Sequence, residues 1–187
     1  MHKLCFIGLG NPGSKYDNTR HNIGKDWLVK LSESYCGNFV KKSKLEAEIT
    51  QSRSDEILWI IPDNYVNNSG KTISKVIKNT NLPKNKMIIL HDDLDLNPGE
   101  VKIKLGGGHG GHNGLKDIFE KTGSKKFYRI RIGIGHPGDK SDVTNWVLSK
   151  SKPKDKTLIE EGFHDLSKVF NLMCEKKFSE AQLQLHT

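Results

Sequence analysis

Three short stretches of the sequence are apolar without interruption, and they constrain the fold more than any other feature. They span residues 4–7, 57–61 and 87–90, and each ends at a glycine, a proline or an abrupt change to polar residues. Unbroken apolar runs of this length are typical of strands that are buried on both faces. Patterns with helical spacing lie between and after them, so we expect an α/β fold with a mixed, largely parallel, twisted sheet flanked by helices.

Apolar periodicity predicts the remaining elements. Helices are expected over about residues 21–36, around Ile73–Ile77 with Ser69 as the cap, and around Leu115–Phe119. Residues 45–52 and 101–105 predict partly exposed strands, and alternation at 129–134 places Arg129 and Arg131 on the polar face of a further strand. With 187 residues, we expect a single domain over residues 1–187, helical from about residue 141 onward.

The charge of the chain is strongly positive. Lys and Arg number 30 against 22 acidic residues, which gives a formal net charge of +8. A basic protein suits a polyanionic partner such as nucleic acid, because neutralised phosphates release their counterions. Only four of the basic residues are arginines, so a lysine-rich solvated surface is the alternative explanation.

The cysteines and the N-terminal segment bear on the compartment. Cys5, Cys36 and Cys174 are far apart and form no CxxC pair, which argues against a disulfide framework and a zinc knuckle. The first apolar run is too short for a signal peptide or a membrane span. We therefore expect a cytoplasmic protein without membrane association, and a monomer as the simplest state.

Residues 8–13 match the pattern GxGxxG after a predicted strand. This pattern suggests dinucleotide binding, and Glu33 lies about as far along the chain as the acidic residue of that motif. However, residues 14–20 are polar without helical spacing, and Glu33 falls inside a predicted helix. We expect instead a glycine turn that brings the backbone and Asn11 close to a ligand.

His21 and Asp92 are candidates for acid–base chemistry. His21 lies at the predicted start of a helix, and Asp92 and Asp93 follow a buried strand. An aspartate that orients a histidine fixes its tautomer and suits it to act as a general base near neutral pH. No GxSxG motif is present and Cys5 lies inside a strand, so water is the expected nucleophile. The alternative is a structural role for His21.

The segment 106–114 contains glycine at most positions. Its conformational freedom permits the close approach of a ligand, and the turn into the next helix offers backbone N–H groups to an anion. A zinc site made by His91, Asp92, His109 and His112 is the competing interpretation. We expect no metal, and the roles of His109 and His112 stay open.

Several segments together resemble the bacterial-type peptidyl-tRNA hydrolase family. They are GLGNPGSKYDNTRHNIG (8–24), NYVNNSGK (64–71), HDDLDLNPGEVKIKLGGGHGGHNGLKD (91–117) and FYRIRIGIGHPGDK (127–140), in the order of the family. The resemblance implies a single α/β domain and hydrolysis of the ester between a peptide and tRNA. It implies no cofactor and no metal.

The resemblance also implies roles for particular residues. His21 would be the catalytic base and Asp92 its orienting partner. The expected contacts to peptidyl-tRNA are the active-site asparagines Asn11, Asn67 and Asn113, the tyrosines Tyr16 and Tyr65, and the phosphate-binding Lys104 and Arg131. Residues 106–116 and 136–145 are candidates for a loop that covers the cleft.

Two residues depart from the family pattern, since Val66 stands where methionine is common and Asn68 where leucine is common. Val66 would alter the apolar wall of the peptide cleft. Three other functions compete: a nucleotide-dependent oxidoreductase, a tRNA-binding module without activity, and an altered paralogue acting in RNA processing. The first rests on GxGxxG and the second on the charge, while an intact set of His21, Asp92 and asparagines argues against the third.

Overall fold

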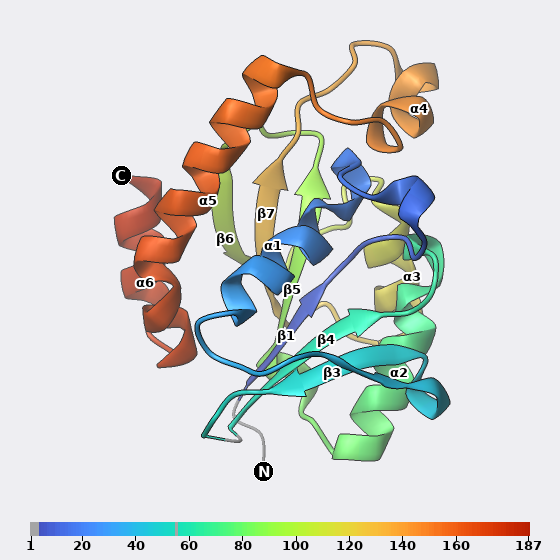
Figure 1. Ribbon diagram of the computed structural model, residues 1–187, viewed down its shortest axis with the longest axis vertical. Helices are drawn as coiled ribbons and strands as arrows, with labels where there is room; N and C mark the ends of the chain where they lie inside the picture. Colours follow the sequence, from blue (N-terminus) through green and yellow to red (C-terminus); the bar gives the residue numbers. More distant parts are fainter. Residues whose placement is uncertain (1–3, 55) are drawn as a thin grey trace.

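The computed structural model describes residues 4–54 and 56–187, and its centre is one seven-stranded sheet (Figure 1). The strand order is β2-β3-β4-β1-β5-β7-β6. The four central strands, β4, β1, β5 and β7, are parallel, and the pairs β2–β3, β3–β4 and β6–β7 are antiparallel. The strands are β1 (Leu4–Gly8), β2 (Val40–Lys42), β3 (Ala47–Gln51), β4 (Ile57–Pro62), β5 (Met87–Asp93), β6 (Val101–Leu105) and β7 (Tyr128–Gly133).

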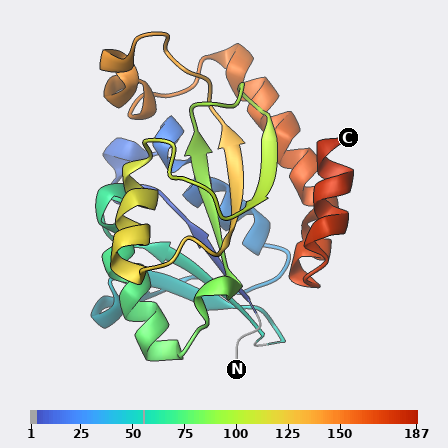
Figure 2. The same ribbon diagram turned by 180° about the vertical axis from the view of Figure 1, so that it is seen from behind.

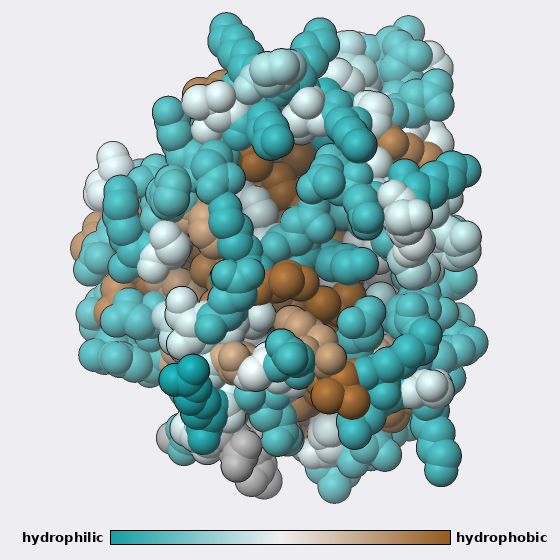
Figure 3. Space-filling model, in the orientation of Figure 1, coloured by the Kyte–Doolittle hydropathy of each residue, from teal (hydrophilic) through white to brown (hydrophobic). Residues whose placement is uncertain are grey.

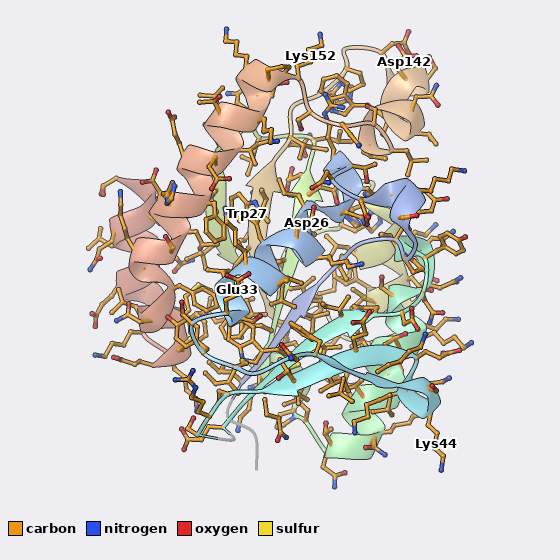
Figure 4. All side chains as sticks on the ribbon, viewed as in Figure 1. Asp26, Trp27, Glu33, Lys44, Asp142 and Lys152 are labelled. Carbon is orange, nitrogen blue, oxygen red and sulfur yellow. The ribbon has the colours of Figure 1, made fainter. Side chains whose placement is uncertain are left out.

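Helices cover both faces of the sheet. The α-helices are α1 (Ile23–Ser32), α2 (Ser69–Thr80), α3 (Asn113–Thr122), α4 (Val143–Val147), α5 (Pro153–Cys174) and α6 (Phe178–His186). Helices α1, α5 and α6 pack on one face around Phe6, Trp59 and Phe170, and α2 and α3 pack on the other. Trp27 of α1 points toward α5 and meets Phe163 edge to face at 5.4 Å (Figure 4). Each apolar run is therefore buried on both sides, as expected for a central strand.

Helix α6 protects the edge of the sheet at β6. The N–H of Ile103 donates to Nε2 of His186 (3.0 Å), and the side-chain amide of Gln182 donates to the Ile103 carbonyl oxygen (2.9 Å). An open edge strand invites pairing with another chain. Side chains of α6 occupy these two backbone groups instead.

The α/β architecture and the predicted mixed, largely parallel sheet are confirmed, but some local predictions are wrong. Ser69 does not cap α2: it is the first helical residue, and its hydroxyl donates to the Val66 carbonyl oxygen (2.7 Å). Strand β5 does not stop where the sequence turns polar, because pairing with β7 extends it through Asp93. Helix α1 begins at Ile23, since a 3₁₀ turn holds Arg20–Asn22.

The surface is as polar as the composition of the chain suggests (Figure 3). Figure 3 shows a face that is mostly hydrophilic, with hydrophobic atoms in patches between polar side chains. In residues 4–54 and 56–187, no helix is both long and apolar enough to cross a membrane.

Candidate active site

A cavity of about 500 Å³ lies beyond the carboxyl ends of the parallel strands. In Figure 1 the arrowheads of β5 and β7 point toward the end of the molecule that carries α4. Ligands bind at this edge in open α/β sheets because the loops after the strands converge there. The nine residues that the sequence marked as candidates all line the cavity: Asn11, Tyr16, His21, Tyr65, Asn67, Asp92, Lys104, Asn113 and Arg131.

His21 and Asp92 form a hydrogen-bonded pair in the wall of this cavity. Nδ1 of His21 lies 2.9 Å from Oδ2 of Asp92, and the carboxylate is buried. Burial alone would lower the pKa of His21, but the charge of Asp92 and the hydrogen bond to it outweigh burial and raise it. Because Nδ1 faces the carboxylate, a neutral His21 carries its proton there and keeps the lone pair of Nε2 for the cavity.

His112 shares the same carboxylate. Its Nε2 lies 2.9 Å from Oδ1 of Asp92, and its Nδ1 accepts the N–H of Leu115 at the start of α3 (3.3 Å). Burial would raise the pKa of Asp92, but the charges of the two histidines and their hydrogen bonds hold it well below its usual range. Both ring nitrogens of His112 are thus engaged by the protein, which makes His112 a cap of α3 and a support for Asp92.

His21, Asp92 and His112 also have the composition of a metal site. This set differs from the one considered from the sequence, which contained His91 and His109 in place of His21. Ligand atoms of His21, Asp92 and His112 lie within 4.8 Å of one another. His91 does not join them: it is fully buried, with Nδ1 bonded to the Asp92 backbone carbonyl oxygen (2.7 Å), and burial lowers its pKa to about 3. Nδ1 of His21 and Nε2 of His112 each lie 2.9 Å from an oxygen of Asp92, a distance that fits a hydrogen bond between each histidine and the carboxylate.

The three asparagines present their amides differently. Oδ1 of Asn11 accepts the N–H of Val66 (2.8 Å), so its Nδ2 is the free donor toward the cavity. The amides of Asn67 and Asn113 also line the cavity and make no hydrogen bond to the described residues. Asn11 is therefore a fixed donor, while Asn67 and Asn113 can donate or accept.

The backbone of Asn11 is held by a residue that sequence reasoning did not assign. Oδ1 of Asn22 accepts the N–H of Asn11 (2.8 Å), and Nδ2 of Asn22 donates to the Asn11 carbonyl oxygen (2.9 Å). Asn22 is almost completely buried. The only signal in the sequence was its place directly after His21.

Two tyrosines and two cations lie at the rim of the cavity. Tyr16 and Tyr65 meet edge to face, with ring centroids 5.9 Å apart, and Tyr65 is exposed. The Nε of Arg131 donates to Oδ2 of Asp93 (2.7 Å), which orients the guanidinium group, and Lys104 is exposed without an ion pair among the described residues. A fixed arginine beside a free lysine is a suitable arrangement for a phosphate group.

Arg129 is not on a solvated face, contrary to the alternation. It is buried, and its guanidinium group donates to the carbonyl oxygens of Gly106 (2.8 Å) and Gly108 (3.0 Å). Arg129 thereby holds the start of the glycine-rich segment, which crosses in front of β7 and β5 in the view from behind (Figure 2). Both candidate cover loops contribute to the cavity wall.

The glycines of residues 8–13 also act differently from the expectation. A Cβ on Gly8 would lie 2.7 Å from both the Gly24 carbonyl oxygen and the Leu28 side chain, so this glycine allows α1 to approach β1 rather than a ligand. Glu33 is the exposed residue at the end of α1 and is labelled in Figure 4. The helix does not start at these glycines, which removes the basis for a dinucleotide site.

The segment before His21 is tied to α4. The guanidinium group of Arg20 donates to the carbonyl oxygen of Trp146 (3.2 Å) and to the hydroxyl of Ser149 (2.6 Å), and it stacks on the Trp146 ring at 3.5 Å. Its backbone N–H donates to the Ser149 carbonyl oxygen (3.0 Å). The cavity wall at α4 and the histidine are thus held together by one residue.

Comparison with known proteins gives the same assignment over nearly the whole chain. Residues 5–187 match the model of the family described as peptidyl-tRNA hydrolase. The chain belongs to this family. A peptidyl-tRNA hydrolase from Nitrosomonas eutropha is 40% identical over 185 residues, which cover 97% of this chain and 94% of that protein. One from Histophilus somni is 40% identical over 185 residues, with 97% and 95% covered.

Solved structures of peptidyl-tRNA hydrolases share the fold. The crystal structure of the enzyme from Acinetobacter baumannii superposes with a TM-score of 0.93 at 33% identity, covering 99% of this chain and 96% of that one. As a member of this family the protein is an enzyme, a carboxylic ester hydrolase acting on peptidyl-tRNA. The site geometry therefore has to account for ester hydrolysis.

Proposed function

We propose that His21, oriented by Asp92, activates water for attack on the ester that joins a peptide to tRNA. The observation that carries the proposal is the pair at 2.9 Å, with Nδ1 facing the carboxylate and Nε2 left for a cavity lined by three asparagine amides. Nε2 accepts a proton from water as the oxygen attacks the ester carbonyl. The resulting imidazolium then donates a proton to the leaving ribose oxygen.

Charge that develops on the carbonyl oxygen needs hydrogen-bond donors. The bond from the N–H of Val66 to Oδ1 fixes the orientation of the Asn11 amide and leaves Nδ2 as a donor, so we assign it to the oxyanion or to a peptide carbonyl. Asn67 and Asn113 bind the peptide backbone, whose groups both donate and accept. Val66 is buried against the position of Gly114 and forms part of the wall beside them.

The tRNA is held mainly through its phosphates. Lys104 and Arg131 provide the charge, and Tyr16 and Tyr65 provide aromatic faces for the end of the acceptor arm. The substrate is peptidyl-tRNA. We propose that the enzyme acts on it in the cytoplasm and as a monomer. Its products are the free peptide and a tRNA that can be charged again.

The test is the release of labelled peptide from an N-blocked aminoacyl-tRNA, with wild type and His21→Ala measured side by side in EDTA. We expect rapid release by wild type and a loss of about 10²–10⁴-fold in kcat for His21→Ala, with tRNA binding retained. His164→Ala is the control, because this histidine is exposed on α5. An active His21→Ala enzyme would refute the assignment, and dependence of wild type on added zinc would reinstate the metal interpretation.

A further inference from the structure

Asn22 holds Asn11 by two hydrogen bonds and has no substrate-facing role of its own. Its amide bonds both the N–H and the carbonyl oxygen of Asn11, at 2.8 and 2.9 Å. Only 1% of Asn22 is exposed, so substrate cannot reach it. The side chain spans eleven residues of sequence and satisfies two buried backbone groups at once.

The bonds made by Asn22 continue into the segment that carries Asn67. The side chain of Asn11 in turn bonds the next segment, because its Oδ1 accepts the N–H of Val66. Asn22 also directly follows His21, within the same 3₁₀ turn. A single buried amide therefore connects the turn of the base with the two segments that carry Asn11 and Asn67.

We propose that Asn22 is a positioning residue that sets the distance between the general base and the amide donor of Asn11. The inference rests on the proposed function, because it needs Asn11 to contact the substrate. Attack on the ester requires water at Nε2 of His21 while Nδ2 of Asn11 holds the substrate through the ester carbonyl oxygen or a peptide carbonyl oxygen. Small displacements of such groups are costly for the rate, since a shift of about 1 Å can lower it by about 100-fold.

The chemistry of asparagine suits this task better than that of other residues of its size. One amide supplies an acceptor and a donor side by side, matching the N–H and carbonyl oxygen of a peptide backbone. Aspartate keeps the acceptor but places a second acceptor against the Asn11 carbonyl oxygen. Alanine removes both bonds and leaves two buried backbone groups without partners, which costs stability as well.

The experiment is a double-mutant cycle on kcat/KM with Asn11→Ala, Asn22→Ala and the double variant. We expect Asn22→Ala to lower kcat about 10- to 100-fold with KM little changed, because the phosphate contacts of the tRNA stay in place. In the Asn11→Ala background, Asn22→Ala should lower kcat/KM by less than about twofold, because the residue acts through Asn11.

The control is Asn64→Ala. Asn64 is half-buried outside the cavity, and its amide donates to the Thr72 hydroxyl (2.8 Å), so its loss tests the removal of a structural asparagine. We expect this variant to lower the unfolding midpoint without coupling to Asn11. If Asn22→Ala does not fold, Asn22→Asp replaces it, since it has nearly the same volume and still loses one of the two bonds.

Equal losses from Asn22→Ala in the wild-type and Asn11→Ala backgrounds would overturn the inference, because the residue would then act on stability or through another group. A defective Asn22→Ala beside a fully active Asn11→Ala would overturn it too. The proposed function is tested separately, since it depends on the activity of His21→Ala and not on the cycle.

Discussion

The carboxylate of Asp92 bonds two histidines, and these histidines differ in whether their second ring nitrogen is free. His112 has no free nitrogen when neutral, because Leu115 occupies its Nδ1. His21 keeps Nε2 for the cavity. The two rings lie 5.2 Å apart. This asymmetry, and not residue type, supports the proposal that His21 is the base.

The raised pKa of His21 predicts the pH dependence of the reaction. A general base must be neutral, so kcat/KM should fall as the pH drops through the pKa of His21, at a value above the usual 6.5. Asp92→Asn removes the charge that raises this pKa, so its acidic limb should move to lower pH while the maximal rate falls by orders of magnitude. The measurement is a profile of kcat/KM against pH for both proteins.

Asp142→Asn is the control for this profile, because Asp142 is exposed beside α4 (Figure 4). Its acidic limb should coincide with that of wild type. An unchanged limb in Asp92→Asn would show that a group other than His21 governs the profile.

Sequence motifs identified nine residues that line the cavity, but not the residues that hold them in place. His21, Asp92 and the asparagines stand in recognisable segments, and the carboxyl-edge rule brought them together. Asn22, Arg20 and Arg129 were not assigned, since their partners are backbone carbonyl or N–H groups distant in sequence. The direction of a backbone group depends on the fold, and residue patterns do not encode it.

Helix α1 owes its position to glycines on both sides of its contact with the sheet. A Cβ on Gly24 would lie 2.2 Å from the carbonyl oxygen of Leu90 in β5. The next residues of β5 are His91 and Asp92, so the distance between α1 and β5 also sets the distance between His21 and its carboxylate. The packing of α1 on β5 and the geometry of the His21–Asp92 pair therefore depend on the same close approach.

Gly24→Ala should consequently damage both stability and activity. The clash is with backbone, so α1 must move, and we expect a loss on the order of 3 kcal/mol in the free energy of unfolding. Urea unfolding and kcat measure the two effects. Gly37→Ala is the matched control, because its Cβ would meet nothing within 4 Å; a Gly24→Ala protein as stable as this control would contradict the packing argument.

Elements were predicted well where one signal dominates. The three apolar runs became β1, β4 and β5 because burial on both faces leaves little choice. Ends were predicted less well, since β5 gains residues from its pairing with β7 and α1 loses its first turn to a 3₁₀ turn. Both differences arise from tertiary contacts.

For the molecule as a whole, the net charge of +8 predicts a salt-dependent affinity for tRNA. Lys104→Ala combined with Arg131→Ala should raise KM and reduce the slope of log K against log salt concentration by about 1.5, as two phosphate contacts disappear. The measurement is binding of deacylated tRNA between about 50 and 200 mM salt.

A variant of equal charge change is the control for the salt slope. Lys44→Ala combined with Lys84→Ala removes two exposed lysines that do not line the cavity, and Lys44 lies at the opposite end of the molecule from α4 (Figure 4). Its slope should stay close to that of wild type. Equal slopes for both double variants would mean that overall charge, and not a phosphate site, determines binding.

The contacts between Arg20 and Ser149 join two segments that lie far apart in the sequence. Strand β1 precedes β4 and β5 in the chain but lies between them in the sheet. The anchors of the His21 segment at Trp146 and Ser149 are translated more than a hundred residues later. The segment before His21 therefore cannot be joined to the cavity wall at α4 in a nascent chain until residues 146–149 have been synthesised.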